Sequence, residues 1–136
     1  MEEWIESGKG VHSIRDHPNH DRPLNGGLWG GKHGAVKGMG RLIKSRASAQ
    51  KYGMDLTFLN TAVWPTVKND QMSHDAYTCH KHPGAVPFPT QRRRDYQHVG
   101  QVFNEHDQPR MKDIDGFLRG RRTPPQCRKK KDWEFG

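Results

Sequence analysis

Hydrophobic residues recur along this chain in short groups, which predict brief helices and strands separated by long polar stretches. Residues 2–7 have the pattern of a short helix that ends at Gly8, and the alternation of apolar and polar residues over 11–14 predicts a strand. Apolar residues at helical spacing predict a longer helix over 35–52, which Gly53 would end.

The second half of the chain continues this pattern. Asp55 is a candidate N-cap for a helix over 56–63, and Pro65 is expected to end or kink that helix. Two more short strands are expected, over 72–75 and 98–103, with a long polar loop between them. The elements together predict a mixed α/β (α+β) fold with few short strands, two to three helices and long loops.

The composition limits how large a core this fold can have. Leu, Ile, Val and Phe make up about 16% of the 136 residues, below the ~20% at which disorder becomes a realistic alternative for a charged chain. A chain of this length normally buries about two-thirds of its surface. We therefore expect either a domain that is marginally stable alone or a piece of a larger domain.

The positive charge is concentrated near the C-terminus. The chain has a formal net charge of +8, and residues 119–131 hold seven Lys and Arg and no acidic residue. The sequence thus predicts a domain over 1–109 and a basic, largely disordered tail over 110–136. A tail of this kind is either simply solvated or makes a weak contact with a polyanion such as nucleic acid or acidic lipid. Only Trp133 and Phe135 lie near it, so it offers little aromatic stacking for bases.

Membrane and secretion signals are not evident in the sequence. No run of 18 apolar residues predicts a transmembrane helix, and the acidic residues after Met1 are unlike a signal peptide. Cys79 and Cys127 could pair in a secreted protein, but two cysteines do not make a disulfide framework. The sequence therefore leaves the compartment open.

The densest group of chemically active residues lies between 15 and 31. A predicted strand runs into a loop with His, Asp and Arg side chains, and glycine pairs on both sides of a tryptophan follow. Adjacent glycines let backbone amides approach a ligand, a tryptophan can stack on a sugar or base, and arginine can hold a phosphate. The spacing matches neither a P-loop nor a dinucleotide-binding fingerprint. The alternative is a glycine-rich turn with a packed tryptophan.

Metal binding is a second possibility. Two groups of candidate ligands lie close together in the sequence, His12 with His17 and His20, and Cys79 with His80 and His82, but neither has the spacing of a zinc site. His74 and Asp75, at the end of a predicted strand, are better candidates for ligands to a divalent cation. The Asp113-Ile114-Asp115 sequence superficially matches the aspartate pair of many glycosyltransferases, but we expect an exposed helix or turn there.

The order of several short motifs resembles a family of glycosyltransferase-like proteins that are similar to nucleotide-diphospho-sugar transferases of the GT-A type. The resemblance extends over roughly residues 2–109. It rests on Glu3-Trp4-Ile5, Ser7-Gly8-Lys9, His12, Arg15-Asp16-His17-Pro18, His20, Pro23-Leu24, Gly26-Gly27-Leu28-Trp29-Gly30, Tyr52-Gly53-Met54-Asp55, Phe58-Leu59, Val63-Trp64-Pro65, His74-Asp75, Pro87-Phe88-Pro89-Thr90, Arg92-Arg93 and Val99-Gly100-Gln101-Val102-Phe103.

The resemblance implies a partial GT-A-like fold. In such proteins an Asp-rich, nucleotide-binding half precedes the segment that matches Glu3-Trp4-Ile5, so this chain is expected to correspond to the C-terminal portion and to be inactive without the other half. Leu56 stands where the family pattern has Gln, and Leu24-Asn25 replaces an apolar pair before the glycines. The first departure weakens the expectation that residue 56 binds the donor sugar.

The resemblance also implies roles for individual residues. Sugar transfer from a nucleotide donor needs a carboxylate near the acceptor hydroxyl and a divalent cation, Mn or Mg, on the diphosphate. The expected roles are: Asp16 or Asp55 as catalytic base; Arg15, His17, His20, Gly26, Gly27 and Trp29 as substrate-binding residues; and His74 and Asp75 as metal ligands in the complete domain. We further expect the Gly26–Trp29 loop and the His74-Asp75 pair to face one cleft.

Two functions of different class follow. The first is a glycosyltransferase-like protein that takes a nucleotide-sugar donor and a glycan acceptor when the domain is complete. The alternative is a non-enzymatic basic module that binds nucleic acid or an acidic surface through residues 119–131. The sequence identifies neither the donor sugar nor the acceptor, and it does not indicate whether transfer inverts or retains the anomeric configuration.

Overall fold

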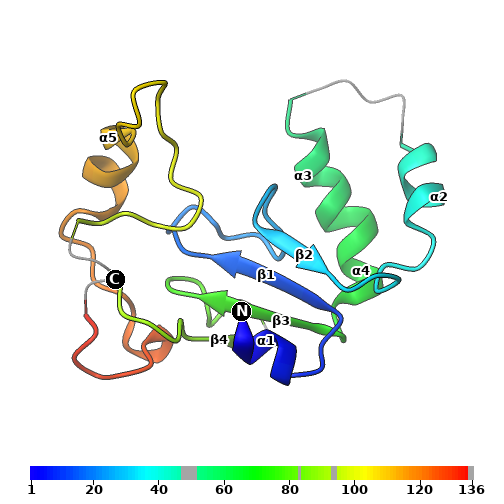
Figure 1. Cartoon of the computed structure of the whole chain (residues 1–136), viewed down its shortest axis with the longest axis horizontal. Helices are drawn as coiled ribbons and strands as arrows, with labels where there is room; N and C mark the ends of the chain where they lie inside the picture. Colours follow the sequence, from blue (N-terminus) through cyan, green and yellow to red (C-terminus); the bar gives the residue numbers. More distant parts are fainter. Residues whose placement is uncertain (47–51, 83, 93–94, 135–136) are drawn as a thin grey trace. The chain divides into compact units, whose positions relative to one another are not determined.

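A computed structural model of the chain describes residues 1–46, 52–82, 84–92 and 95–134 and shows a mixed α+β fold (Figure 1). Its sheet has the strand order β2-β1-β3-β4, with β1 at Val11–Arg15, β2 at Trp29–Gly31, β3 at Gln71–Asp75 and β4 at Ala85–Val86. β2 is antiparallel to β1. Backbone hydrogen bonds from Val11 to Asp70 and from Ala76 to Arg15 show that β1 and β3 run parallel.

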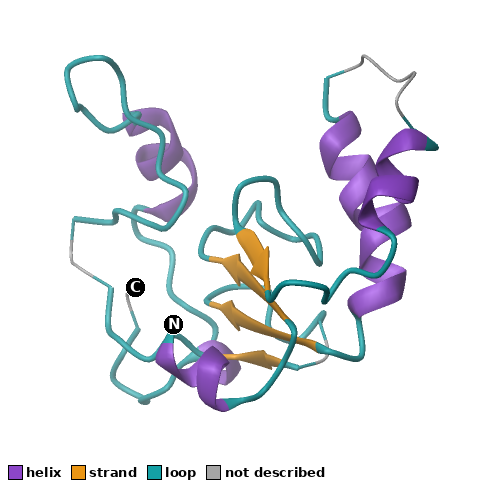
Figure 2. Cartoon of the chain, turned by 45° about the vertical axis from the view of Figure 1, so that its right-hand side comes forward, coloured by secondary structure: helices purple, strands orange, loops and turns teal. Residues whose placement is uncertain are grey.

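Short helical segments make up the rest of the regular structure (Figure 2). They are α1 (Glu2–Glu6), α2 (Met39–Lys44), α3 (Met54–Phe58), the π-helical segment η1 (Leu59–Val63), α4 (Trp64–Val67), α5 (Met111–Asp113), the π-helical segment η2 (Ile114–Leu118) and the 3₁₀ turn η3 (Pro125–Cys127). Predicted elements over 2–7, 11–14 and 72–75 are confirmed by α1, β1 and β3.

The helix predicted from residue 56 forms, but Pro65 does not end it. The chain passes from α3 through η1 into α4 and stays helical to Val67. The wide turn of η1 comes immediately before Pro65, which therefore lies in the first turn of α4, where the α-helix does not need its missing amide. Gly53, predicted to end a helix, instead precedes α3 with a left-handed φ of 76°.

Two other predicted elements differ from the structure. Of the helix expected over 35–52, only α2 is helical among the described residues, and positions 47–51 lie outside them. The strand predicted over 98–103 does not form, because Gly100 takes a left-handed φ of 89° in a turn closed by a hydrogen bond from Gln101 to His98. Only Phe103 pairs there, in an isolated bridge with Pro109.

The chain divides into two compact units, and the division runs through β1 and β3. The first unit contains residues 1–14 and 22–73. Its core is aliphatic, with partly buried aromatic side chains around it: Val11, Leu24, Leu59, Val63 and Val67 are buried, and Trp29, Phe58 and Trp64 pack against them. Gly10 is needed beside this core, because a Cβ there would lie 2.3 Å from the Asp70 carboxylate that its amide binds.

The second unit contains residues 15–21 and 74–136. Its hydrophobic cluster is small, comprising Ala76, Tyr77 and Leu118 with Phe88 and Tyr96 beside them. Where the sequence predicts a boundary at residue 110 and a disordered tail, the structure has α5, η2 and η3 within this unit. The physical reason is that Ile114, Leu118 and Cys127 are buried and hold this segment in place.

Candidate functional site

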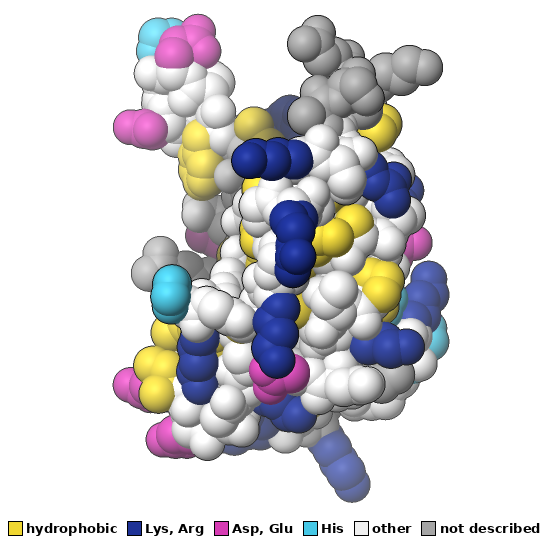
Figure 3. Space-filling model, turned by 90° about the vertical axis from the view of Figure 1, so that its right-hand side faces the viewer, with side chains coloured by type: hydrophobic (Ala, Val, Ile, Leu, Met, Phe, Trp, Pro, Cys, Tyr) yellow, Lys and Arg dark blue, Asp and Glu magenta, His cyan; other side chains and the backbone are white. Residues whose placement is uncertain are grey.

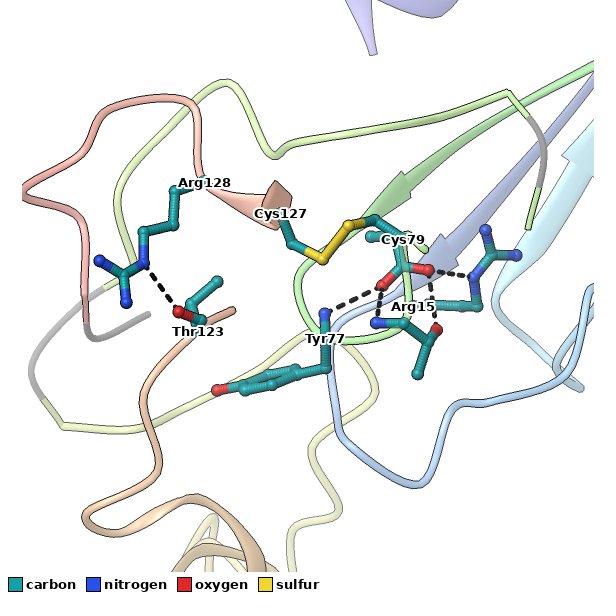
Figure 4. Close-up of a disulfide and its surroundings, with 8 residues drawn as sticks. Arg15, Tyr77, Cys79, Thr123, Cys127 and Arg128 are labelled. Atoms are coloured by element: carbon teal, nitrogen blue, oxygen red, sulfur yellow. Dashed lines mark hydrogen bonds and ion pairs between the residues drawn. A yellow bond between two sulfur atoms is a disulfide. The ribbon is translucent and has the colours of Figure 1, made fainter. Parts of the chain in front are cut away.

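A buried ion pair joins the β1 and β3 residues that belong to the second unit. Arg15 and Asp75 are 1% and 0% exposed, and the Arg15 Nε lies 2.6 Å from Asp75 Oδ2. The other hydrogen bonds to this carboxylate come from the backbone amides of Tyr77 and Thr78 and from the Thr78 hydroxyl (Figure 4). Four donors satisfy the buried charge, so Asp75 fixes the turn that follows β3.

That turn is joined covalently to the C-terminal segment. Cys79 and Cys127 form a disulfide across 48 residues of sequence. Beside it, the Arg128 Nε donates to the Thr123 carbonyl oxygen at 2.7 Å (Figure 4), and the Thr123 amide donates to the carbonyl oxygen of Glu134. The two cysteines, which the sequence left unassigned, thus tie residues 123–134 to the turn after β3.

Asp16 forms a second ion pair in the same unit. Its carboxylate pairs with Arg92 and accepts a hydrogen bond of 2.9 Å from the backbone amide of Val99. Arg92 also donates to the Asp16 carbonyl oxygen and to the Tyr77 hydroxyl. Burial raises the pKa of Asp16, and the opposing charge of Arg92 only partly offsets that effect.

Three histidines form a cluster in this unit. The ring centroid of His17 lies 5.3 Å from that of His20 and 4.8 Å from that of His98. The Nδ1 of His17 accepts from the Asn19 amide, so a neutral ring carries its proton on Nε2, which lies 3.5 Å from the Asp113 carbonyl oxygen. Burial lowers the pKa of all three, and repulsion from His17 adds to burial in lowering those of His20 and His98 to about 4.

A pocket of about 310 Å³ lies in the second unit. Its lining residues include Asp16 and His98. They also include cationic and aromatic side chains, among neutral ones: Arg92, Arg128, Lys129, Phe88 and Trp133. Lys130 lies over the Trp133 ring at 5.3 Å. A concave site with several cations and two aromatic rings suits a ligand that carries both an anionic group and a flat or apolar one.

The predicted site residues separate into two groups. The second unit brings together Arg15, Asp16, His17, His20, His74 and Asp75, whereas the first unit contains Gly26, Gly27, Trp29 and Asp55. Within the first unit Gly26 and Asp55 are neighbours, because a Cβ at Gly26 would lie 3.0 Å from Asp55 Oδ2. Trp29 is partly buried against the aliphatic core. The cleft expected to join the two groups stays a prediction.

The side chains suggested as metal ligands have other contacts. Both oxygens of Asp75 are occupied by the hydrogen bonds described above, and the His74 ring packs against Phe88 at 5.6 Å. The described residues contain no group of three His, Cys, Asp or Glu side chains arranged to hold a metal ion. The donor set does not fit a resident cation, so we derive no chemistry through one. Cys79, which belongs to the group with His80 and His82, forms the disulfide with Cys127 and therefore has no thiol that could bind zinc.

The basic C-terminal residues also have partners. Arg119 pairs with Asp115, and both Arg122 and Arg128 approach Glu134. Asp113 and Asp115 lie on α5 and η2, so the expected helix forms, but it is not exposed throughout, because Ile114 between them is buried. Asp113 pairs with Arg110. Contact of residues 119–131 with a polyanion stays a prediction.

Several residues that line the pocket have no role assigned from the sequence. Arg92 and Phe88 were part of the family resemblance without an assigned role, and Arg128, Lys129 and Trp133 were assigned to a disordered tail. The available signal was Cys127, because a cysteine in the tail with one possible partner, Cys79, limits where the tail can lie.

Comparison with models of protein families, with curated proteins and with solved structures found no match. No helix in the described part of the chain is long and apolar enough to cross a membrane.

Proposed function

We propose that the chain is a glycosyltransferase-like protein and that the pocket of its second unit binds the phosphate-bearing part of a nucleotide-sugar donor. One observation carries the proposal: Asp16, a buried carboxylate with a raised pKa, lies in the wall of a pocket with three cationic side chains. The GT-A type of fold is part of this proposal and rests on the motif order in the sequence.

The charges of the pocket support a phosphorylated ligand. Arg92 and Arg128 are held by hydrogen bonds to Asp16 and Thr123, so their guanidinium groups are already positioned before a ligand binds. A phosphate that enters this site meets oriented donors and loses less conformational entropy than it would beside flexible side chains. Trp133 offers a ring face for a base or sugar.

Asp16 is the better candidate for the catalytic carboxylate. It is buried, lines the pocket and has a pKa that burial shifts upward, which brings it closer to the range of a general base. Asp55 is exposed in the first turn of α3. In a complete domain Asp16 would accept the proton of the acceptor hydroxyl as that oxygen bonds to the anomeric carbon of the sugar. The bond from this carbon to the diphosphate oxygen breaks in the same transfer, and the nucleoside diphosphate leaves with its electron pair.

Isothermal titration of the full chain with uridine diphosphate, guanosine diphosphate and the two unphosphorylated nucleosides tests this function. We expect at least one diphosphate to bind, and its nucleoside to bind at least about tenfold more weakly, because the phosphates supply the contacts with the cations. Lys129→Gln should weaken binding of the diphosphate about fivefold.

Lys131→Gln is the matched control, because Lys131 is an exposed lysine two residues away that does not line the pocket. Its affinity for the diphosphate should stay within about twofold of the unmodified chain. Absence of binding by both diphosphates, or an equal loss in the two lysine variants, would reject the proposed pocket.

A further inference from the structure

The first unit has an acid-free basic stretch of its own. Residues 22–54 contain seven Lys and Arg and no Asp or Glu, the same number of cations as in 119–131. The net charge of the whole chain conceals this stretch because acidic residues elsewhere compensate for it.

Five of these cations are exposed, and we refer to them together as the basic face: Lys32, Lys37, Arg41, Lys44 and Arg46. Within the described ranges none of the five pairs with a carboxylate. Lys32 donates to the carbonyl oxygen of Gly8, which leaves its charge uncompensated. The basic face therefore differs from the C-terminal segment, where Arg119, Arg122 and Arg128 approach acidic side chains.

The same stretch of sequence contains an exposed aliphatic side chain. Ile43 on α2 is 53% exposed and lies between Arg41 and Lys44 in the sequence, whereas Met39 on the same helix packs against the core. α2 is thus attached to the first unit through Met39 and presents Ile43 together with cations to solvent. Figure 3 views the side on which α2 lies in Figure 1 and shows Lys and Arg spread over this side, with hydrophobic side chains between them.

We propose that the basic face docks the first unit onto an anionic lipid surface. Its cations contact the head groups, and Ile43 enters the boundary between head groups and acyl chains. Membrane lipid fits this surface better than nucleic acid does. Residues 32–46 contain no Phe, Tyr or Trp on which a base could stack, and Ile43 gains from an apolar phase that nucleic acid lacks. The proposal is independent of the donor pocket.

The full chain can be tested by co-sedimentation with vesicles of phosphatidylcholine, with and without phosphatidylserine, at low salt. Binding should require phosphatidylserine. The triple variant Lys37→Gln, Arg41→Gln, Lys44→Gln should bind about 10- to 100-fold more weakly, because three cations leave the interface. The matched control is Lys81→Gln, Arg121→Gln, Lys131→Gln, which removes the same charge from exposed positions of the second unit and should stay within about threefold.

The variant Ile43→Ser distinguishes binding to a lipid surface from binding to other polyanions. The variant keeps every charge and alters an exposed position, so it should fold normally. It should bind the anionic vesicles about fivefold more weakly and leave any binding of duplex DNA unchanged. Absence of vesicle binding, equal losses in the two triple variants, or full vesicle binding by Ile43→Ser would overturn the proposal. Titration of nucleoside diphosphates is a separate measurement, so neither result determines the other.

Discussion

The hydrophobic core of the first unit is aliphatic, with Leu24 and Val63 fully buried, whereas the buried side chains of the second unit include the charged Arg15, Asp16 and Asp75. An aliphatic core contributes through the area that it buries and hardly responds to pH or redox conditions. A buried ion pair contributes only while both partners and their hydrogen bonds are present. The stability of the unit with the candidate pocket should therefore depend more strongly on solution conditions than that of the first unit.

The largest expected effect is in the second unit. Asp75→Ala removes the acceptor of four hydrogen bonds and leaves the Arg15 guanidinium buried without this counter-charge, so it should lower the free energy of unfolding by about 3–5 kcal/mol. Urea denaturation followed by circular dichroism measures this loss. Asp115→Ala, which removes an exposed ion pair with Arg119, is the control and should cost under about 1 kcal/mol. Similar losses in both variants would contradict the importance of burial.

The aliphatic core gives the second prediction. Leu24 is fully buried, and Leu24→Ala should lower the free energy of unfolding by about 2–5 kcal/mol through lost transfer energy and the cavity that remains. The loss should be the same at pH 7 and pH 5.5, because no titratable side chain is removed. A strong dependence on pH in the same urea experiment would show that this core is coupled to the ionisable groups of the second unit.

Loss of the disulfide is the third change expected to affect the two units differently. The bond joins residues 48 positions apart, and its loss in Cys79→Ser, Cys127→Ser should cost about 2–4 kcal/mol because the unfolded chain gains freedom. Amide hydrogen exchange should show faster opening of residues 123–134, with β2 and α3 little changed. Uniform acceleration across both units would contradict a local effect.

Acidification should produce a smaller loss per residue, again in the second unit. The pKa values of His20 and His98 are lowered to about 4 from an ordinary 6.5. Between these values the unfolded chain binds more protons than the folded chain, so stability is complete above about pH 6.5 and falls as the pH decreases toward 4. By pH 5 the loss should be about 2 kcal/mol for each of the two histidines. His98→Gln should flatten this dependence, and an unchanged slope in denaturation measured from pH 7 to 5 would contradict it.

The sequence predicted the parts of the fold that depend on local patterns. The alternation at Val11 and the glycine stop at Gly8 are such local signals, and both match the structure. The π-helical turn η1 was not predictable from the spacing of apolar residues, because that spacing does not distinguish a π-helical turn from an α-helical one. The tail was assigned to solvent since its polar composition conceals the few buried anchors, Leu118 and Cys127, that fold it into the second unit.

Local sequence patterns also predicted only part of the candidate site. The residues around Asp16 were selected because acids, histidines and arginines are dense there, and the structure places Asp16 at a pocket. Arg92 was not selected, because its ion pair with Asp16 joins positions 76 residues apart. Trp29 was selected for its glycine neighbours, yet it packs against an aliphatic core. Residue type suggested the chemistry, but only tertiary contacts determined which side chains surround the pocket.

The central claim is that the second unit contains the ligand site. Amide hydrogen exchange of the full chain, with and without saturating nucleoside diphosphate, tests it most directly. We predict that protection increases at residues 88–92, 97–99 and 127–133, the segments that contribute most of the pocket's lining residues, while β2 and α3 are unchanged. Protection confined to the Gly26–Trp29 loop and to α3, or no change anywhere, would contradict the claim.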